Sequence, residues 1–344
     1  MNSESEKSPD LLNYSFCTFF DQNYLARGFT LIESLRLKGD NAEILVICLD
    51  KITLDSLTPF SKSLRLKLVS LDKLLIEYPE LSATRKSRSE VEFYFTCTPF
   101  VIKFSLSTKP EKHLVIYLDA DLYFFESPQL IISQSKDHSV SIIPHNYPWF
   151  LKHLASRYGF FNVGLMVFKN DFSGNSVLNW WAQNCLAWCH DYPEAGKFAD
   201  QGYLNDFSQI SDGTKVLTHP GFNLAPWNTA SNVLSFRNKG VQIDGLPLVF
   251  FHFHNLKQRG HRWFTSQVNY LSPLSRRAIK SIYHPYLVHL EKSELRFKKD
   301  DWNQDSISRR GVGFKGLLAN LARIVFMIFS LLSGQTVKSR NLIS

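Results

Sequence analysis

The sequence predicts an α/β fold in which a mixed, mainly parallel sheet is flanked by helices. Strand and helix patterns alternate through the first half of the chain, as they do in parallel sheets. The run AEILVICLD (42–50) is apolar without alternation, which is typical of a strand buried on both faces. The run HLVIYLDAD (113–121) is equally apolar and ends in two aspartates. Ligands of such sheets bind beyond the carboxyl ends of the strands.

The first half supplies the elements of this sheet in order. Residues 14–20 predict a strand, and residues 23–39 predict a helix that ends at a glycine. The apolar side chains of that helix share one face: Leu25, Phe29, Ile32 and Leu35. The other predicted elements of this half are strands at 42–50, 64–71, 113–121 and 139–145, a helix at 89–106 that is broken or kinked near Pro99, and a short helix after Pro128.

The second half is less regular. Residues 160–170 predict a strand whose glycine, Gly164, marks a close approach of another group. Residues 175–192 predict a helix with one apolar stripe formed by Leu178, Trp181, Cys185 and Trp188. The other predicted elements are a short helix at 198–207, an ordered loop at 219–228 and a strand at 247–257 that ends in two histidines.

Composition sets the domain organisation. The chain has 344 residues, of which 44% are hydrophobic, enough for a packed core. Polar residues 1–10 predict a flexible tail. We expect one domain over 11–296, with a nucleotide half at about 11–145 and an acceptor half at about 146–296. A polar linker over 297–313 and a basic amphipathic segment over 314–344 follow.

The segment LLANLARIVFMIFSLL (317–332) is apolar, but Asn320 and Arg323 interrupt it. Its uninterrupted run is about half of the ~20 residues that span a bilayer. Lys315, Arg323 and Ser330 share one helical face, a pattern typical of a helix that lies in the membrane interface. The alternative is a terminal helix that packs on the protein's own core. The polar linker before it favours peripheral membrane contact.

Charge and cysteine content narrow the possible partners. The net charge of +8 suggests an anionic partner, but no nucleic-acid-binding motif is present, so we expect no nucleic acid. The five cysteines (17, 48, 97, 185 and 189) are too scattered for a disulfide framework. They predict small core residues in a reducing compartment, the cytoplasm, with the cytoplasmic face of the membrane as a possible site of action.

Asp119 and Asp121 are the first candidate site. Residues two apart on a strand point to the same face, and two ionised carboxylates there repel each other unless a cation bridges them or one is protonated. Oxygen ligands of this kind suit Mg(II), Mn(II) or Ca(II). The alternative is a solvated strand end, because a single D-x-D is expected by chance in a chain of this length.

His252 and His254 are the second candidate site, since they alternate at the end of the last predicted strand. Lys257, Arg259 and His261 follow them, so the pattern favours a metal ligand beside a phosphate-binding patch. Imidazole added to carboxylates favours Mn(II) over Ca(II). The alternative is a pair of structural histidines.

Four motifs in order, YLDADLYFF (117–125), FNVGLMVF (161–168), ADQGYLNDF (199–207) and FFHFHNLK (250–257), resemble the landmarks of GT-A glycosyltransferases. The nearest group contains glycogenin and the lipopolysaccharide galactosyltransferases, together with bacterial sugar-nucleotide transferases. The resemblance covers roughly residues 14–260 and implies a GT-A, Rossmann-like fold.

The resemblance also implies roles for particular residues. Asp119 and Asp121 match the D-x-D metal pair, with Asp119 shared between metal and donor, and His252 matches the metal histidine, with His254 as its rival. Asn255 replaces the family's glycine and Lys257 falls one residue early for the phosphate lysine, so Arg259 is a rival phosphate contact. The remaining matches are the catalytic-centre residues Asn162, Asp200 and Gln201, and the nucleotide-sugar contacts Thr18, Phe20, Tyr24, Arg85 and Arg88, with Glu92 beside them. The alternative for Arg85, Arg88 and Glu92 is an exposed basic start of a helix.

The predicted function is therefore metal-dependent transfer of a hexose from a nucleotide diphosphate, a UDP-sugar by preference, to an acceptor hydroxyl. The cofactor is Mn(II) or Mg(II), and the resemblance favours retention of configuration. A glycan or lipid-linked acceptor in bacterial surface glycan or lipopolysaccharide assembly is expected. Two alternatives stay open: nucleotidyl transfer that forms a sugar nucleotide, and a non-enzymatic, membrane-associated glycolipid-binding protein.

Overall fold

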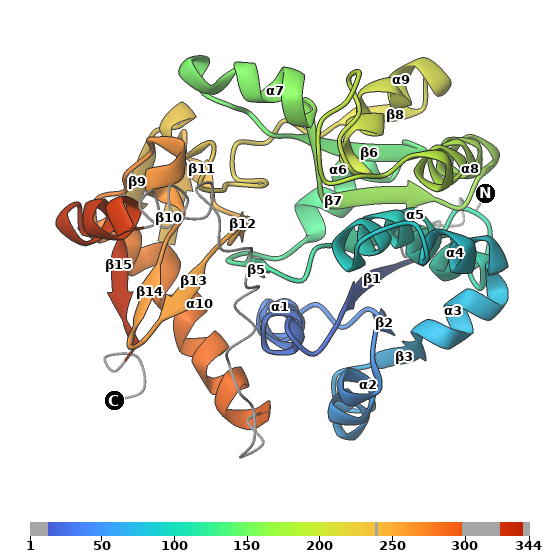
Figure 1. Cartoon of the computed structure of the whole chain (residues 1–344), viewed down its shortest axis with the longest axis horizontal. Coiled ribbons are helices and arrows are strands. Elements are labelled where there is room, and N and C mark those ends of the chain that lie inside the picture. The colour runs from blue at the N-terminus through green and yellow to red at the C-terminus, as the bar shows by residue number, and fades with distance from the viewer. Residues whose placement is uncertain (1–12, 238–239, 298–323, 340–344) are drawn as a thin grey trace, which may run out of the picture.

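A seven-stranded sheet forms the centre of the molecule in the computed structural model, which describes residues 13–237, 240–297 and 324–339 (Figure 1). Its strands, in spatial order, are β3 (Leu66–Ser70), β2 (Ile44–Cys48), β1 (Tyr14–Phe20), β4 (Leu114–Leu118), β7 (Phe161–Lys169), β6 (Val140–Pro144) and β8 (Thr214–Val216). The first four are parallel, and β7 is antiparallel to both of its neighbours. The predicted α/β fold with a mainly parallel sheet is confirmed.

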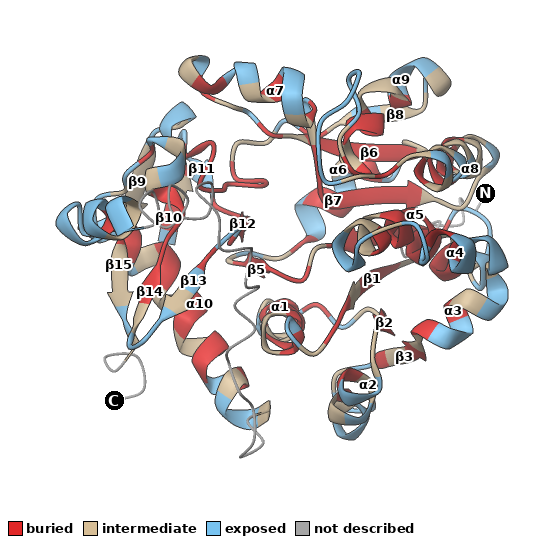
Figure 2. Ribbon diagram, in the orientation of Figure 1, coloured by how far each residue is buried: buried red, intermediate tan, exposed pale blue. Residues whose placement is uncertain are grey.

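Strands such as β2 carry apolar side chains on both faces, and helices cover both faces of the sheet, so these strands are buried (Figure 2). On one face the core contains side chains of α3 (Leu71–Glu77), α4 (Pro79–Thr84), α5 (Glu90–Ser107), α8 (Phe172–Ala187) and α9 (Phe207–Ile210). On the other face it contains side chains of α1 (Leu25–Leu37), α2 (Lys51–Leu57) and α6 (Gln129–Ser135). The remaining helices are α7 (His153–Tyr158) and α10 (Arg276–Phe297), and α10 packs beside α1.

The helix predicted at 89–106 forms as α5, and it continues through Pro99 without the break that was one of the two predicted outcomes there. A proline in a helix removes one backbone hydrogen bond. Here the residue lies in a fully buried turn between Cys97 and Val101, where packing holds the helix together. At its start, Ser89 and Glu92 form a reciprocal capping box.

The second half departs further from the sequence prediction. The stretch at 247–257 is three short strands, β11 (Leu246–Pro247), β12 (Phe250–His252) and β13 (Lys257–Arg259). The chain turns after His252, and Asn255 adopts a left-handed φ of 55°. The segment 198–207 is mainly a 3-10 helix, Gln201–Asp206. The predicted loop at 219–228 contains no helix or strand, and most of its residues are buried.

Three small sheets lie beside the central one. β5 (Leu122–Phe124) pairs with β12, and β10 (Gly240–Ile243) lies between β9 (Leu234–Arg237) and β11. The third sheet joins β13, β14 (Arg262–Phe264) and β15 (Thr336–Lys338). The strand β15 has no counterpart in the sequence prediction.

Part of the predicted domain organisation lies outside the described residues. These parts are the tail 1–10, all but the first residue of the linker 297–313, and residues 314–323 and 340–344 of the C-terminal segment. Within that segment, residues 324–332 are helical. Over the described ranges, we find no helix with the length and hydrophobicity needed to cross a bilayer.

Candidate metal and nucleotide-sugar site

The central sheet and the β5–β12 pair place Asp119, Asp121 and His252 together. Asp119 follows the last residue of β4, and its backbone N–H donates to the carbonyl of Gly164 in β7 at 2.9 Å. Asp121 precedes β5, whose Leu122 lies opposite His252 of β12. The N–H of Phe253 donates to the carbonyl of Asp121 at 2.9 Å, which fixes this register.

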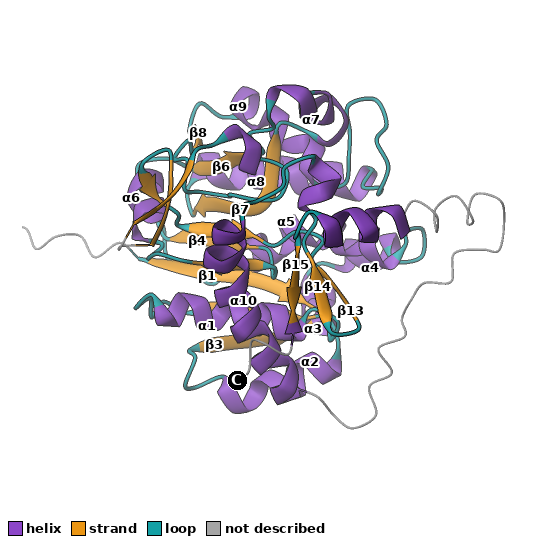
Figure 3. Ribbon diagram, turned by 90° about the vertical axis from the view of Figure 1, so that its left-hand side faces the viewer, coloured by secondary structure: helices purple, strands orange, loops and turns teal. Residues whose placement is uncertain are grey.

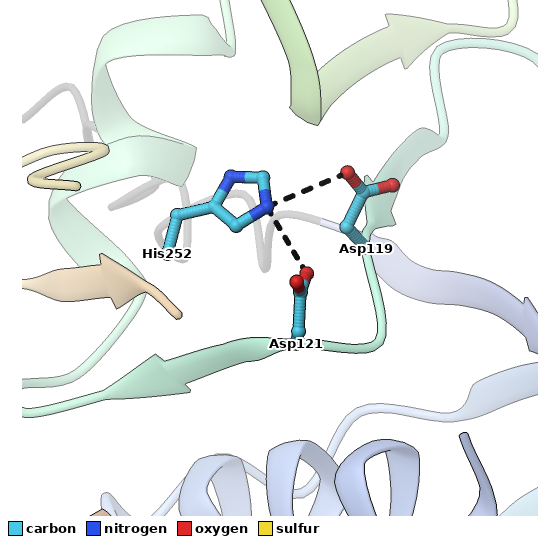
Figure 4. Close-up of side chains that lie close together, drawn as sticks. All are labelled: Asp119, Asp121 and His252. Atoms are coloured by element: carbon cyan, nitrogen blue, oxygen red, sulfur yellow. Dashed lines mark ion pairs between the residues drawn. The ribbon is translucent and has the colours of Figure 1, made fainter. Parts of the chain in front are cut away.

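The three side chains converge (Figure 4). The Nε2 atom of His252 lies 3.0 Å from Oδ1 of Asp121 and 3.9 Å from Oδ2 of Asp119. One ligand atom from each residue falls within 4.8 Å of the other two, close enough to hold one metal ion. Two carboxylates and one imidazole are a donor set that suits Mn(II) or Mg(II). The His252 and Asp121 side chains are 5% and 12% exposed, whereas Asp119 is 30% exposed and so remains open to a ligand.

The electrostatics separate the two aspartates. Burial disfavours the charged form of Asp121, but the adjacent His252 outweighs it and lowers the pKa of this carboxyl. Burial, together with the charge of Asp121, raises the pKa of Asp119. For His252, burial opposes the cationic form, yet the Asp121 carboxylate raises the pKa of the imidazole. Without a metal ion, a proton on His252 therefore balances the charge of Asp121.

A chain of side-chain hydrogen bonds leads from His252 to Gln201. Oδ1 of Asn162 lies 3.3 Å from Nδ1 of His252 and accepts from the N–H of Gly164 at 3.1 Å. Nδ2 of Asn162 donates to Oε1 of Gln201 at 3.0 Å, and Nε2 of Gln201 donates to the carbonyl of Tyr158 at 2.7 Å. Backbone groups at both ends fix the amide orientations, so Nδ1 of His252 must carry a proton to donate to Asn162. In the neutral imidazole, Nε2 then has its lone pair free for a metal.

Gly164 makes this arrangement possible. A Cβ atom at this position would lie 2.6 Å from Oδ1 of Asn162 and 2.8 Å from Nδ1 of His252. The sequence prediction of a close approach at this glycine is confirmed, and the groups that approach are Asn162 and the His252 ring.

Asp200 is buried and is bonded to residues of α8 and α5. Its carbonyl accepts from Nε1 of Trp181 at 2.8 Å, and its carboxyl bonds to Thr98. Burial, reinforced by the charge of Asp119, raises the pKa of Asp200 to about 7. Asp200 is therefore close enough to the group of Asp119, Asp121 and His252 for their charges to interact. Its carboxyl changes charge near neutral pH.

His254 is not part of the group formed by His252 and the aspartates. The two histidines were expected to share one strand face, but β12 ends at His252. His254 lies beyond the turn on the exposed surface, with its ring centroid 6.0 Å from that of His252. The structure therefore brings His252, and not His254, to Asp119 and Asp121.

The predicted donor residues of the first loop differ in exposure. Thr18 and Phe20 are buried in β1, and Oγ1 of Thr18 has no hydrogen-bond partner within the described part of the chain. Phe20 fills the space above Gly28 of α1. Tyr24 is 46% exposed, with the guanidinium carbon of Arg27 5.5 Å from its ring centre.

The other predicted donor contacts are held by packing. Arg88 donates to the carbonyl of Leu186 at 2.7 Å and to the hydroxyl of Thr96, which ties it to α5 and α8. The guanidinium of Arg85 lies over the ring of Phe93. Lys257 and Arg259 are exposed on β13. Burial opposes ionisation of Glu92, but bonds from Ser89, Asp191 and His190 lower the pKa of Glu92 to about 2.

Two residues near the metal group were missed by sequence reasoning. Nη2 of Arg27 donates to the carbonyl of Leu256 at 2.6 Å, which places a cation near enough to Asp121 to help lower its pKa. Trp227 packs edge-on against His252, with ring centroids 5.1 Å apart. Arg27 follows Tyr24, a predicted donor contact, by three residues. This spacing puts both on one helical face, and it was the available evidence in the sequence that Arg27 lies near the site.

Comparisons with known proteins found similar solved structures and, separately, similar sequences. No family model matches the chain. Among solved structures, the galactosyltransferase LgtC matches with a TM-score of 0.49 and 11% identity, over 81% of this chain and 95% of LgtC. Mouse xyloside xylosyltransferase 1 matches with a TM-score of 0.45 and 13% identity, over 71% of this chain and 98% of the mouse protein. Both of these matched proteins are named as glycosyltransferases.

The sequence relatives are bacterial. The chain is 25% identical over 284 residues to the uncharacterized protein YfnD of Bacillus subtilis (strain 168), across 81% of this chain and 89% of YfnD. It is 31% identical over 246 residues to the uncharacterized protein YfnF of the same organism, across 70% of this chain and 80% of YfnF. The chain therefore belongs to the family of YfnF.

Proposed function

We propose that the protein is a metal-dependent glycosyltransferase that moves a hexose from a nucleotide diphosphate, a UDP-sugar by preference, to an acceptor hydroxyl. The observation that carries the proposal is the convergence of Asp119, Asp121 and His252 at the carboxyl end of a central strand. A site at this edge of an α/β sheet is where such folds bind ligands. The order of the four motifs along the chain supports the same class.

In this proposal Asp121 and His252 hold Mn(II) or Mg(II), and the more exposed Asp119 is shared between the metal and the donor. The bound ion would supply Lewis-acid stabilisation of the diphosphate leaving group. Asn162 holds Nε2 of His252 toward the carboxylates and, through Gln201, connects the metal group to the reacting centre. Thr18, Phe20, Tyr24, Arg85, Arg88 and Lys257 remain the proposed donor contacts, and Arg259 the rival to Lys257.

Retention of configuration is the proposed stereochemical course, with Asp200 and Gln201 at the reacting centre. An inverting reaction would need a carboxylate to deprotonate the acceptor. Asp200 could do so because the pKa of its carboxyl is raised to about 7. We propose a glycan or lipid-linked acceptor, in bacterial surface glycan or lipopolysaccharide assembly at the cytoplasmic side of the membrane, with residues 11–296 as the transferase domain.

Calorimetry with UDP and Mn(II) tests the site. Wild type should bind UDP more tightly with Mn(II) than with EDTA, and Asp121→Ala should lose that difference. Asp137→Ala is the matched control, since Asp137 is exposed on the surface. An equal response of wild type and Asp121→Ala would overturn the metal site.

A screen of nucleotide sugars then tests the reaction. Metal-dependent release of UDP, followed by assignment of the product anomer, identifies a glycosyltransferase and its stereochemistry. Pyrophosphate release from a nucleoside triphosphate would instead identify nucleotidyl transfer. No turnover with any donor, despite intact UDP binding, would favour the non-enzymatic alternative.

A further inference from the structure

The helix at 324–332 turns its apolar side chains outward. The exposed fractions of Ile324, Val325, Ile328, Phe329, Leu331 and Leu332 range from 44% to 82%. Ser330 is fully buried on the opposite side. With about 100° per residue, the exposed side chains cover an arc of about 160°. Within its described residues, this helix therefore does not pack its apolar face on the protein's own core, and Figure 2 shows it largely exposed.

The residues after this helix fix it to the body of the protein. Gln335 is buried, and its side chain exchanges hydrogen bonds with Leu274, accepting from the N–H at 3.0 Å and donating to the carbonyl at 2.9 Å. Its carbonyl accepts from the N–H and the hydroxyl of Thr265. The helix thus leads without a free linker into β15, beside β14 and β13 (Figure 3).

The sheet beside the helix carries an unusual row of cations. Arg259, Arg262 and Lys338 are directly opposite one another on β13, β14 and β15. The neighbouring row includes Trp263, which is buried and donates to Glu291 of α10 at 2.8 Å. Because side chains alternate between faces, the cationic row points away from α10.

Like charges directly opposite in a sheet repel one another. None of the ion pairs found within residues 13–237, 240–297 and 324–339 involves the three cations of this row. Among the side chains that the structure describes, Nη1 of Arg262 donates to the hydroxyl of Thr336 at 3.2 Å, which carries no charge. An anionic partner would remove the repulsion.

We propose that the apolar helix face and the cationic row form one docking surface for an anionic lipid bilayer. Apolar side chains of an interfacial helix enter the acyl boundary, while nearby cations bind acidic headgroups. A purely apolar partner would leave the charges of Arg259, Arg262 and Lys338 unpaired, whereas acidic headgroups complement them. The charges therefore favour a bilayer as the partner. This inference rests on the proposed function, because a surface that binds the bilayer would hold the enzyme next to a lipid-linked acceptor.

Sedimentation with vesicles tests the surface. The full chain should bind vesicles of phosphatidylcholine with 30% phosphatidylglycerol and bind pure phosphatidylcholine at least about tenfold more weakly. Ile328→Ser/Phe329→Ser and, separately, Arg262→Gln/Lys338→Gln should each lower the affinity about tenfold or more. The matched controls Ile76→Ser/Phe172→Ser and Lys62→Gln/Lys136→Gln change exposed residues elsewhere and should bind like wild type.

A site-specific label shows whether the helix itself enters the bilayer. All five native cysteines are buried, so a thiol dye should react selectively with an introduced Ile328→Cys. An environment-sensitive dye there should shift to the blue on addition of the anionic vesicles, and the same dye at Phe172→Cys should not. This readout does not depend on the stability of the serine variants.

Three outcomes would overturn the proposal. They are no vesicle binding by wild type, an equal loss in the control variants, or a dimer in sedimentation velocity that Ile328→Ser/Phe329→Ser dissociates without any vesicle binding. The last would assign the face to a second copy of the chain. Asp121→Ala should bind vesicles like wild type, so failure of the transferase site and failure of the docking surface are distinguishable.

Discussion

Nε2 of His252 lies 3.0 Å from Oδ1 of Asp121, and the two residues come from segments that meet only through the pairing of β5 with β12. The pKa of the imidazole is raised and that of the carboxyl is lowered, because burial of each is outweighed by the other's charge. A divalent ion bound at this position would take the place of the proton on Nε2.

Mn(II) binding should therefore release a proton. Below the raised pKa of His252, each ion bound should displace up to one proton, and affinity should rise with pH until His252 is neutral. Calorimetry at pH 6.5 in two buffers with different ionisation enthalpies measures the release. His252→Asn should bind Mn(II) weakly with no such buffer dependence. Equal heats for wild type in both buffers would contradict the arrangement.

Gly164→Ala should damage the metal site while the fold persists. The added Cβ would lie within 2.8 Å of both Asn162 and the His252 ring, so the imidazole must shift. We expect Mn(II) affinity to fall about tenfold or more, with a loss of about 1–3 kcal/mol in the free energy of unfolding. Gly213→Ala is the control, because its Cβ would crowd Ser139 at 2.8 Å in another part of the fold. A similar loss of Mn(II) affinity in both variants would point to general destabilisation.

Asp200→Asn should change how stability depends on pH. Burial raises the pKa of Asp200 from its ordinary value of about 4 to about 7, so the folded state binds the proton more tightly. The wild-type free energy of unfolding should therefore fall as pH rises from about 4 to about 7. Relative to wild type, the variant should gain about 2–4 kcal/mol between pH 4 and pH 8.

Urea denaturation in EDTA across this range measures the effect of Asp200. Asp137→Asn is the control and should follow the wild-type curve. Parallel curves for wild type and Asp200→Asn would show that Asp200 is ionised at neutral pH.

Glu92→Gln should weaken the fold at neutral pH and not in acid. Glu92 accepts from the backbone and hydroxyl of Ser89, both at 2.8 Å, and it lies 3.0 Å from Nδ1 of His190. Because its pKa is lowered to about 2, the stabilisation is present above about pH 4.3 and is lost as pH falls toward 2. We expect a loss of about 1–3 kcal/mol at pH 7.

The same denaturation series tests Glu92. The difference between wild type and Glu92→Gln should shrink below pH 4, and Glu77→Gln, at an exposed position, should show no difference. A constant gap down to pH 2 would mean that packing, and not charge, accounts for the loss.

The sequence predicted the strands of the central sheet because their apolar runs are local and continuous. It also predicted that Asp119 and Asp121 lie at the end of a strand, because the strand and both carboxylates fall within nine consecutive residues. The choice of His252 as a metal ligand came from its position in the motif FFHFHNLK, which resembles that of GT-A glycosyltransferases. The turn that separates it from His254 could not be seen, because it depends on pairing between β12 and β5.

Long-range contacts account for the features that were missed. A hydrogen bond to the carbonyl of Leu256 holds Arg27 near Asp121, and pairing with β14 makes residues 336–338 a strand. Neither segment carries a pattern that specifies its distant partner. The outward apolar face of residues 324–332 likewise depends on how Gln335 fixes the helix. Periodicity alone cannot tell which side of a helix faces the protein.

The pairing of β15 with β14 also has a consequence for biosynthesis. Ribosomes make the chain from its N-terminus, so the hairpin of β13 and β14 has an uncovered edge until residues 336–338 leave the exit tunnel. Open strand edges invite pairing with other chains. This hairpin carries Arg259 and Arg262 opposite each other. Charged side chains at an open strand edge disfavour such pairing, so the same cations would act against association of nascent chains before β15 forms.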